Sequence, residues 1–338
     1  MIFSRQKHWQ FLEDELKAET EEFKKTYMTT AISLLKNSNE MYVGQFITFK
    51  EGQMLVKFSH SRTLPRKGQF LVCMLLPPEL QDYRNWGDKT YRDLYRVRYN
   101  STECVCVEVS PTGEPNYSWV IFSKVSLDFA NYIKNAPGIV LTFAPQRPPI
   151  DYSLNLQRII KDSTSQGASF ILDKNYHSKE WEPVLIKQDN VSSFVYTQLQ
   201  MTDTMILEGP PGTGKTHMIA ELCARLCAEG KSVLVTALTN RALMEIAEKP
   251  AMEVFLKDRK VLKTNVTLDE ARELQNLELI KTIAPMPGCL VLSTYYITSA
   301  FAADLFIEQP FDYIIMDEAS QAVLAMFAAS RKIGKKNL

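Results

Sequence analysis

The chain has 338 residues, of which 45% are hydrophobic; this is enough for two domains with their own cores and excludes a disordered protein. Lysine plus arginine and aspartate plus glutamate both number 39, so the net charge of zero draws the whole chain to neither nucleic acid nor anionic lipid, and any such site must be local. The N-terminus lacks the apolar core of a signal peptide and no apolar run reaches about eighteen residues, so we expect a cytoplasmic protein that does not enter a membrane.

Six cysteines lie in apolar runs, where a thiol behaves as a small hydrophobic group. Cys223 and Cys227 have the i, i+4 spacing of one helix face. No second Cys or His pair follows at ligand spacing, and zinc sites normally need three or four protein ligands. We therefore expect reduced, structural cysteines.

The first segment, residues 1–40, is predicted to be a long amphipathic helix. Residues 4–36 carry apolar side chains at spacings of three, four and seven, with Glu and Lys on the other faces. The apolar stripe either packs on the rest of the protein or binds a partner helix. The heptads lapse after about four repeats, which favours packing within the chain.

Residues 41–150 change to the two-residue period of β-strands. Apolar strands separated by turns, among them Glu51–Gly52 and PTGEPN, predict an antiparallel β-barrel-like domain. In ECVCVEV the alternation places Cys104 and Cys106 on one face of a strand and the intervening valines on the other.

Within this domain, DYRNWGDKTYRDLYRVRYN mixes basic with aromatic side chains. Such a composition suits a surface on which the bases of a single strand stack and its phosphates pair with cations. It also occurs in solvated loops whose long side chains cover apolar surface, and composition alone favours this second interpretation. The basic residues are Arg84, Lys89, Arg92, Arg96 and Arg98.

After the prolines of APQRPPIDY, residues 151–189 are polar and predict a connecting region with some helix. In residues 190–338, short apolar strands alternate with helical segments, which is the pattern of a parallel sheet with crossover helices. The expected strands are TMILEG, KSVLVTAL, GCLVLST and FDYIIMD. We therefore expect an α/β domain built on a parallel sheet.

The segment GPPGTGKT matches the phosphate-binding loop G-x-x-x-x-G-K-[ST], with an expected strand before it and a helix after it. Its glycines let backbone N–H groups surround a phosphate, and the helix N-terminus adds a partial positive charge. Lys215 would reach the β- and γ-phosphate oxygens, and the hydroxyl of Thr216 would bind Mg²⁺. The residues assigned to nucleotide binding here are Gly209, Pro210, Pro211, Gly212, Thr213, Gly214, Lys215 and Thr216.

An acidic pair ends the apolar run FDYIIMDEASQA. Asp317 and Glu318 would lie at the C-terminal tip of a strand, the edge of a parallel sheet where ligands bind. Asp317 is expected to hold Mg²⁺. Glu318 is expected to orient and deprotonate the attacking water, which indicates a hydrolase.

Together, GPPGTGKT and DEASQA strongly resemble superfamily 1 helicases of the Upf-like branch, over about residues 190–338. The resemblance implies a RecA-like domain, truncated after its second motif, in an ATP- and Mg²⁺-dependent helicase or translocase acting on single-stranded DNA or RNA. It extends more weakly to a long helix and a small β-barrel before that domain. Gln321 matches the family glutamine on the γ-phosphate side, so the implied catalytic residues are Lys215, Glu318 and Gln321.

Two further segments match the family pattern. VLVTALTNRALMEIAEK fits motif Ia and implies that Thr236, Asn240 and Arg241 contact the backbone of the nucleic-acid strand. VLSTYY fits the next strand-end motif and implies that Ser293 and Thr294 lie near a phosphate.

The sequence departs from the family pattern ahead of the phosphate loop. The family usually reads adenine with Leu-Asn-x-x-Gln, whereas DNVSS keeps Asn190 but has Ser193 where the Gln would stand. Asn190 is therefore expected to contact the nucleotide. The departure bears on adenine specificity and leaves phosphate binding unaffected.

The second departure is the end of the chain. In the family, the strand of motif III follows directly after KKNL, and a second RecA-like domain then supplies arginines to the site. We therefore expect an N-terminal part of a longer helicase, or a truncated reading frame, with unpaired inner edges on the phosphate-loop strand and the Asp317 strand. Arginine fingers contribute about 10³ to 10⁵ in rate, so nucleotide binding without fast turnover is expected.

Two alternatives stay open. One is a P-loop ATPase that remodels protein, against which the matches at Asn240 and Gln321 stand. The other is a nucleic-acid-binding fragment that holds nucleotide without turnover, which a measurable ATPase rate would exclude.

Overall fold

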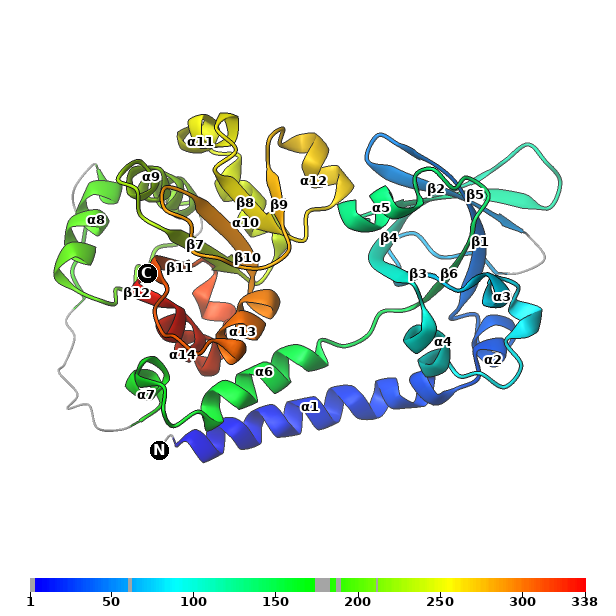
Figure 1. The fold of residues 1–338 in the computed structure, drawn as a ribbon, viewed down its shortest axis with the longest axis horizontal. Helices are drawn as coiled ribbons and strands as arrows, with labels where there is room; N and C mark the ends of the chain where they lie inside the picture. Colours follow the sequence, from blue (N-terminus) through cyan, green and yellow to red (C-terminus); the bar gives the residue numbers. More distant parts are fainter. Residues whose placement is uncertain (1–3, 60–62, 174–182, 187–189, 211) are drawn as a thin grey trace. The chain divides into compact units, whose positions relative to one another are not determined.

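The computed structural model describes residues 4–59, 63–173, 183–186, 190–210 and 212–338. The chain forms two compact units, each built from separate stretches of sequence (Figure 1). The first unit comprises Met1–Leu16, Pro149–Asn265 and Leu274–Leu338, and the second comprises Lys17–Pro148 and Val266–Glu273.

The second unit is a closed antiparallel barrel with the strand order β1-β2-β5-β4-β3-β6. Its strands are β1 (Tyr42–Lys50), β2 (Gln53–Ser59), β3 (Phe70–Leu75), β4 (Asn100–Pro111), β5 (Tyr117–Ser123) and β6 (Val140–Pro145). Alternate residues point inward, where the rings of Phe122 and Phe143 stack with centroids 4.5 Å apart. Cys104 and Cys106 are both buried in this interior, as the alternation predicted.

Short helices accompany the barrel. They are α2 (Ala31–Lys36), α3 (Pro78–Gln81), η1 (Tyr83–Asn85), α4 (Tyr91–Val97), α5 (Leu127–Ile133) and α12 (Leu268–Glu273). In the basic and aromatic stretch, Trp86 and Tyr91 are fully buried, and the guanidinium carbon of Arg98 lies 3.5 Å from the ring centroid of Tyr95. The two buried rings therefore have no face on which a base could stack.

The predicted helix over residues 4–36 is wrong in its extent. Helix α1 (Arg5–Met28) ends at Met28, and α2 follows after Thr29 and Thr30. Thr30 is extended, with ψ of 135°, and pairs with Thr90 in an isolated bridge. Two consecutive β-branched residues disfavour helix, and the bridge supplies the alternative backbone hydrogen bonds.

The first unit contains a six-stranded sheet with the order β12-β11-β7-β10-β8-β9. All of its strand pairs are parallel. This confirms the predicted fold class, an α/β domain that follows a helix and a β-barrel in the sequence. The strands are β7 (Val233–Ala237), β8 (Val261–Thr264), β9 (Glu278–Ile280), β10 (Leu290–Thr294), β11 (Phe311–Met316) and β12 (Gly334–Asn337).

The expected strand TMILEG does not form. Among the described residues, this segment contributes one bridge, between Thr204 and Asn337, and one further backbone bond, from the Met205 N–H to the Asn337 carbonyl. Ile206 is 85% exposed, so the segment lacks the buried faces of a central strand.

The unpaired edge expected on the Asp317 strand is also absent. Strand β12 pairs with β11 through Phe311–Gly334 and Ile314–Asn337. On its other side, β12 meets the segment ahead of the phosphate loop at Thr204. The residues GKKN thus pair with the edge of β11 that was expected to be unpaired, because backbone pairing tolerates their polar side chains.

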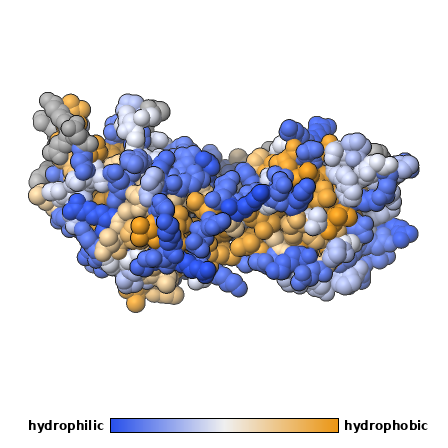
Figure 2. Space-filling view, turned by 90° about the horizontal axis from the view of Figure 1, so that it is seen from above, coloured by the Kyte–Doolittle hydropathy of each residue, from blue (hydrophilic) through white to orange (hydrophobic). Residues whose placement is uncertain are grey.

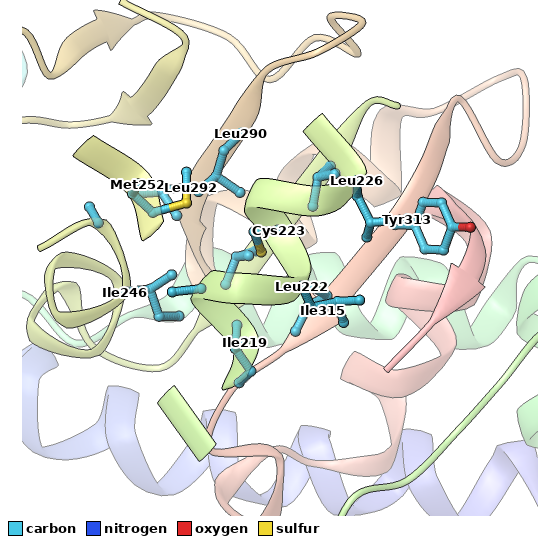
Figure 3. Close-up of a cluster of buried hydrophobic side chains, with 14 of the residues drawn as sticks. Ile219, Leu222, Cys223, Leu226, Ile246, Met252, Leu290, Leu292, Tyr313 and Ile315 are labelled. Atoms are coloured by element: carbon cyan, nitrogen blue, oxygen red, sulfur yellow. The ribbon is translucent and has the colours of Figure 1, made fainter. Parts of the chain in front are cut away.

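One face of the sheet is covered by α8 (Val191–Met201), α9 (Lys215–Ala228) and α10 (Asn240–Ala247). Figure 3 shows Ile219, Leu222, Cys223 and Leu226 of α9 among side chains of the strands. These four side chains are spaced at three and four residues and form the buried stripe of the helix. Two short turns, η2 (Pro250–Met252) and α11 (Glu253–Lys257), lie beside this layer.

The opposite face is covered by α6 (Ile150–Lys161), α7 (Gln166–Leu172), α13 (Tyr295–Asp304) and α14 (Leu324–Ile333), with Leu12 from the start of α1. The predicted connecting region at 151–189 is therefore largely part of the core up to residue 173. Its apolar residues at helical spacing, Leu156 and Ile160 among them, are fully buried. Residues 174–182 and 187–189 lie outside the described part of the chain.

The two units divide the sequence differently from the predicted α/β domain at 190–338. The first unit already begins its second stretch at Pro149, and one segment after residue 190 belongs to the barrel unit. Residues Val266–Glu273 lie within 190–338 in sequence but pack on the barrel. The Leu127 N–H donates to the Val266 carbonyl at 2.9 Å, and the Lys124 N–H donates to the Asp269 carboxylate at 2.9 Å. These backbone-directed contacts carry no hydrophobic period that a sequence could reveal.

On the face drawn in Figure 2, hydrophilic side chains alternate with areas where apolar side chains gather. Over the described residues, no helix combines the length and apolar character needed to cross a bilayer.

Gly167 in α7 should resist substitution. A Cβ at this position would lie 2.6 Å from the Arg331 carbonyl oxygen, a backbone atom of α14. Gly167→Ala should lower the free energy of unfolding by about 1–3 kcal/mol, because the overpacking outweighs the better helix propensity of alanine. The exposed neighbour supplies a control, since Gln166→Ala should leave the urea midpoint unchanged. Equal midpoints for both variants would contradict the close packing.

Asp162 should make folding sensitive to acid. Hydrogen bonds from the Thr164 hydroxyl at 2.6 Å and the Lys332 ammonium at 3.0 Å lower its pKa to about 2. Because the pKa is depressed in the folded state, this contribution is full above about pH 4, the ordinary aspartate value, and is lost as pH falls toward 2. Urea unfolding followed from pH 7 to 2 should show Asp162→Asn losing part of this acid dependence. Asp14→Asn, at an exposed position in α1, should retain it, and identical profiles would refute the assignment.

Candidate functional site

The phosphate loop has the backbone that its glycines allow. Gly212 and Gly214 both have φ of +82°, a left-handed conformation that other residues rarely adopt, and α9 begins directly after them at Lys215. A Cβ at Gly209 would lie 2.9 Å from the Thr213 hydroxyl oxygen, so the loop closes tightly on itself. Pro211 lies outside the described residues.

Lys215 is directed over the loop. Its ammonium donates to the carbonyl oxygens of Gly209 and Pro210, the latter at 3.0 Å, and the Thr213 hydroxyl donates to the Pro210 carbonyl at 2.8 Å. An ammonium that donates to carbonyl oxygens can exchange them for phosphate oxygens, which are stronger, charged acceptors. Thr216 follows in the first turn of α9 and is half-buried.

Asp317 lies at the end of β11, where the backbone fixes it from two sides. Its N–H donates to the Thr236 carbonyl at 3.0 Å, and its carbonyl accepts from the Tyr295 hydroxyl at 2.6 Å. Burial raises the pKa of the Asp317 carboxyl, and the positive charge of Lys215 partly offsets this. The phosphate-loop lysine and this carboxylate are therefore near enough to interact electrostatically.

Glu318 has a strained backbone, with φ of 57°. Its N–H donates to Asp317 Oδ1 at 3.0 Å. Its Oε2 is buried without a hydrogen-bond partner among the described residues, and burial together with the Asp317 charge raises the pKa of its carboxyl. A buried carboxylate oxygen that accepts no hydrogen bond is suited to accept one from a bound ligand or water.

These features fit a Mg²⁺-bound nucleotide. The loop amides and Lys215 would hold phosphate, and Thr216 and Asp317 would hold the metal. The described residues contain no group of three or more His, Cys, Asp or Glu that could bind a metal ion by themselves. Phosphate oxygens would therefore have to complete the coordination.

Two further predicted nucleotide contacts lie near helix ends. Gln321 is exposed in the turn η3 (Ala319–Gln321), where its N–H donates to the Glu318 carbonyl at 2.9 Å. Asn190 caps α8, and its side-chain oxygen accepts from the Ser193 N–H at 2.9 Å. The helix cap uses the side-chain oxygen of Asn190. The predicted contact of Asn190 with the nucleotide stays a prediction.

The predicted nucleic-acid contacts gather at the carboxyl ends of β7 and β10. The hydroxyls of Thr236 and Ser293 are fully buried; the first lies 2.9 Å from the Thr298 hydroxyl, and the second 3.1 Å from that of Thr264. These two side chains reach no solvent, so their predicted contact with a strand would have to come from their backbone.

The other members of this set differ in exposure. Thr294 is 8% exposed at the start of α13, and Asn240 is half-buried at the start of α10. Arg241 is exposed and pairs with Glu245 at 3.1 Å. The prediction for all three stays untested by the geometry.

Three residues of this edge were not singled out from the sequence. Tyr295 fixes the Asp317 carbonyl, and Thr264 and Lys263 of β8 bond to Ser293 and Asn240. For Lys263 and Thr264 the signal was the short run VLKT, in which a lysine interrupts an apolar strand, and Tyr295 lies in the segment VLSTYY.

Lys215 should control nucleotide affinity. Lys215→Ala should weaken binding of a fluorescent ATP analogue at least tenfold, because the charged hydrogen bonds to phosphate are lost. Lys231→Ala, an exposed lysine beyond the other end of α9, should bind as the native chain does. Undiminished binding by Lys215→Ala would show that the nucleotide site lies elsewhere.

Comparison with known proteins agrees with the geometry of this site. A family model described as an AAA domain matches residues 194–333. The chain is 30% identical over 142 residues to the DNA replication ATP-dependent helicase/nuclease DNA2 of Saccharomyces cerevisiae, and 31% identical over 125 residues to that of Gallus gallus. These matches cover 41% and 35% of the chain but span only 9% and 13% of the relatives.

A solved structure is also similar: a nuclease-deletion mutant of the Type ISP restriction-modification enzyme LlaGI in complex with a DNA substrate mimic. The match has a TM-score of 0.31 and 17% identity, and covers 46% of this chain and 17% of the other. Residues 194–333 thus form an AAA-type P-loop domain with distant similarity to the DNA2 helicase/nuclease.

Proposed function

We propose that this chain carries the ATP-hydrolysing half-site of a superfamily 1 helicase or translocase, of the Upf-like kind, that acts on single-stranded DNA or RNA in the cytoplasm. The observation that carries the proposal is the placement of the Asp317–Glu318 pair at the end of β11. There, burial raises the pKa of the Asp317 carboxyl, the charge of the phosphate-loop Lys215 lowers it, and the Glu318 N–H donates to Asp317 Oδ1. The predicted strand contacts lie at the ends of β7, which is next to β11 in the sheet, and of β10, which is next to β7. The similarity to DNA2, a DNA replication ATP-dependent helicase/nuclease, supports the same proposal.

The chemistry follows from the placement of these groups. ATP with Mg²⁺, when bound, supplies the phosphoanhydride bond and the divalent charge. Lys215 neutralises negative charge at the loop. Among the described residues, Glu318 Oε2 has no hydrogen-bond partner, so it can orient water and accept its proton. The raised pKa makes this carboxylate a better base than an ordinary glutamate.

Full turnover is proposed to need groups from a second RecA-like domain, as the resemblance implies. The chain spans about a tenth of the length of the curated relatives it matches. Arginines from such a domain would stabilise the transition state by about 4–7 kcal/mol. A version extended through that domain should therefore hydrolyse ATP much faster than this chain.

ATP hydrolysis by the extended protein should rise several-fold when single-stranded DNA or RNA is added, because strand binding and the nucleotide site share the same sheet edge. Glu318→Gln should reduce the rate at least about a hundredfold, since general-base catalysis is lost. The rate should also fall as pH decreases through the raised pKa of Glu318, where its carboxylate becomes protonated.

Glu253→Gln provides the matched control, because this glutamate is exposed and pairs with Lys257 in α11. Its rate should equal that of the native protein. A rate indifferent to both DNA and RNA strands would favour an ATPase that remodels protein. Full activity of Glu318→Gln would remove this residue from the mechanism.

A further inference from the structure

Lys263 is a fully buried lysine in the six-stranded parallel sheet. It lies in β8, with Val261 on the same face and Leu262 on the opposite one, so its side chain extends toward the layer that contains α10. Burying an ammonium group costs free energy unless good hydrogen bonds compensate for lost water. Two of the hydrogen bonds that offset this cost join Lys263 to residues nearby in the same unit.

The ammonium of Lys263 reaches the start of α10. It donates to Asn240 Oδ1 at 2.8 Å and to the Asn265 carbonyl at 3.1 Å. Asn265 adopts φ of 53°, a left-handed conformation that asparagine tolerates better than most residues. The turn after β8 thus presents its carbonyl back to the lysine.

An ammonium has only donors, so it selects one orientation of the asparagine amide. The Oδ1 atom must face Lys263, and the two N–H groups of Nδ2 must face the other way. Nδ2 donates to no acceptor within the described residues, and Asn240 is half-buried at the first position of an eight-residue helix. Two oriented donors at a helix N-terminus suit a phosphate oxygen.

We propose that Lys263 is a positioning residue for nucleic-acid binding: it fixes the amide of Asn240 so that its N–H groups face the phosphate backbone of a single strand. This inference rests on the proposed function, and it assigns to Lys263 no contact with the strand itself. Asparagine without this partner would rotate between two amide orientations, only one of which donates to phosphate.

The test compares binding of a labelled oligothymidylate and a labelled oligouridylate by fluorescence anisotropy. Lys263→Met and Asn240→Ala should each weaken strand binding by about tenfold. The double variant should be no weaker than either single one, because both changes remove the same interaction. Lys263→Arg should restore much of the affinity, since it keeps the donors.

A buried lysine elsewhere in the same unit gives the matched control. Lys332 is 5% exposed and bonds to Asp162 at 3.0 Å. Lys332→Met should lower the melting temperature without changing strand affinity. Binding of a fluorescent ATP analogue should be unchanged in Lys263→Met, because the hydrogen bonds of Lys263 to Asn240 and Asn265 lie outside the phosphate loop.

The outcomes separate the two proposals. If the native chain binds a strand and Lys263→Met binds it equally well, the positioning role is wrong while the proposed function stands. Additive losses in the double variant, or parallel loss of strand and nucleotide binding, would also overturn it, because they indicate a general structural role. If the native chain binds neither strand, the proposed nucleic-acid function is itself wrong, and the role of Lys263 falls with it.

Discussion

The parallel pairing of β7 with β10 on one side and β11 on the other is the constraint on which the candidate site depends. Parallel strands end at the same edge, so this pairing brings the end of β11, with its carboxylates, beside the polar ends of β7 and β10. The bond from the Asp317 N–H to the Thr236 carbonyl continues the ladder by one residue. A register shift between these strands would separate Asp317 from Lys215 and the strand ends from one another.

The interactions that position the phosphate loop differ from the strand pairing that positions Asp317. The segment before it makes few backbone bonds to the sheet, through Thr204 and Met205 to β12. The helix after it packs a continuous apolar stripe on the strands, with Leu222, Cys223 and Leu226 fully buried. The position of Lys215 therefore depends chiefly on hydrophobic packing of α9. Packing fixes the start of this helix, while the loop ahead of it keeps glycine-dependent conformations that a ligand can order.

The sequence predicted the parts of the structure that a regular period or a tight motif encodes. Alternation revealed the six barrel strands, and GPPGTGKT with its following helix located the phosphate loop. It did not reveal β8, β9 or β12, because each is three or four residues long and two of them are rich in polar residues. The break at Thr30 and the docking of Val266–Glu273 on the barrel rest on backbone bonds between distant residues, which leave no local pattern.

For the site, Asp317 and Glu318 were predicted from the apolar run before them. The supporting Tyr295 and Lys263 could not be found, because their roles depend on which strands become neighbours.

The carboxyl edge of this sheet also holds an unusual amount of buried polarity for a stable core. Hydroxyl pairs join Thr236 to Thr298 and Thr264 to Ser293, and an ammonium joins β8 to α10. Apolar side chains of similar size would pack as well and would avoid the cost of desolvation. Directed bonds instead restrict each strand end to one arrangement, because a shifted neighbour would leave a buried donor or acceptor unpaired. This edge is proposed to present hydrogen-bond donors to one ligand and carboxylates to another. The restriction is useful there, because the donors and the carboxylates then keep fixed positions relative to the same strands.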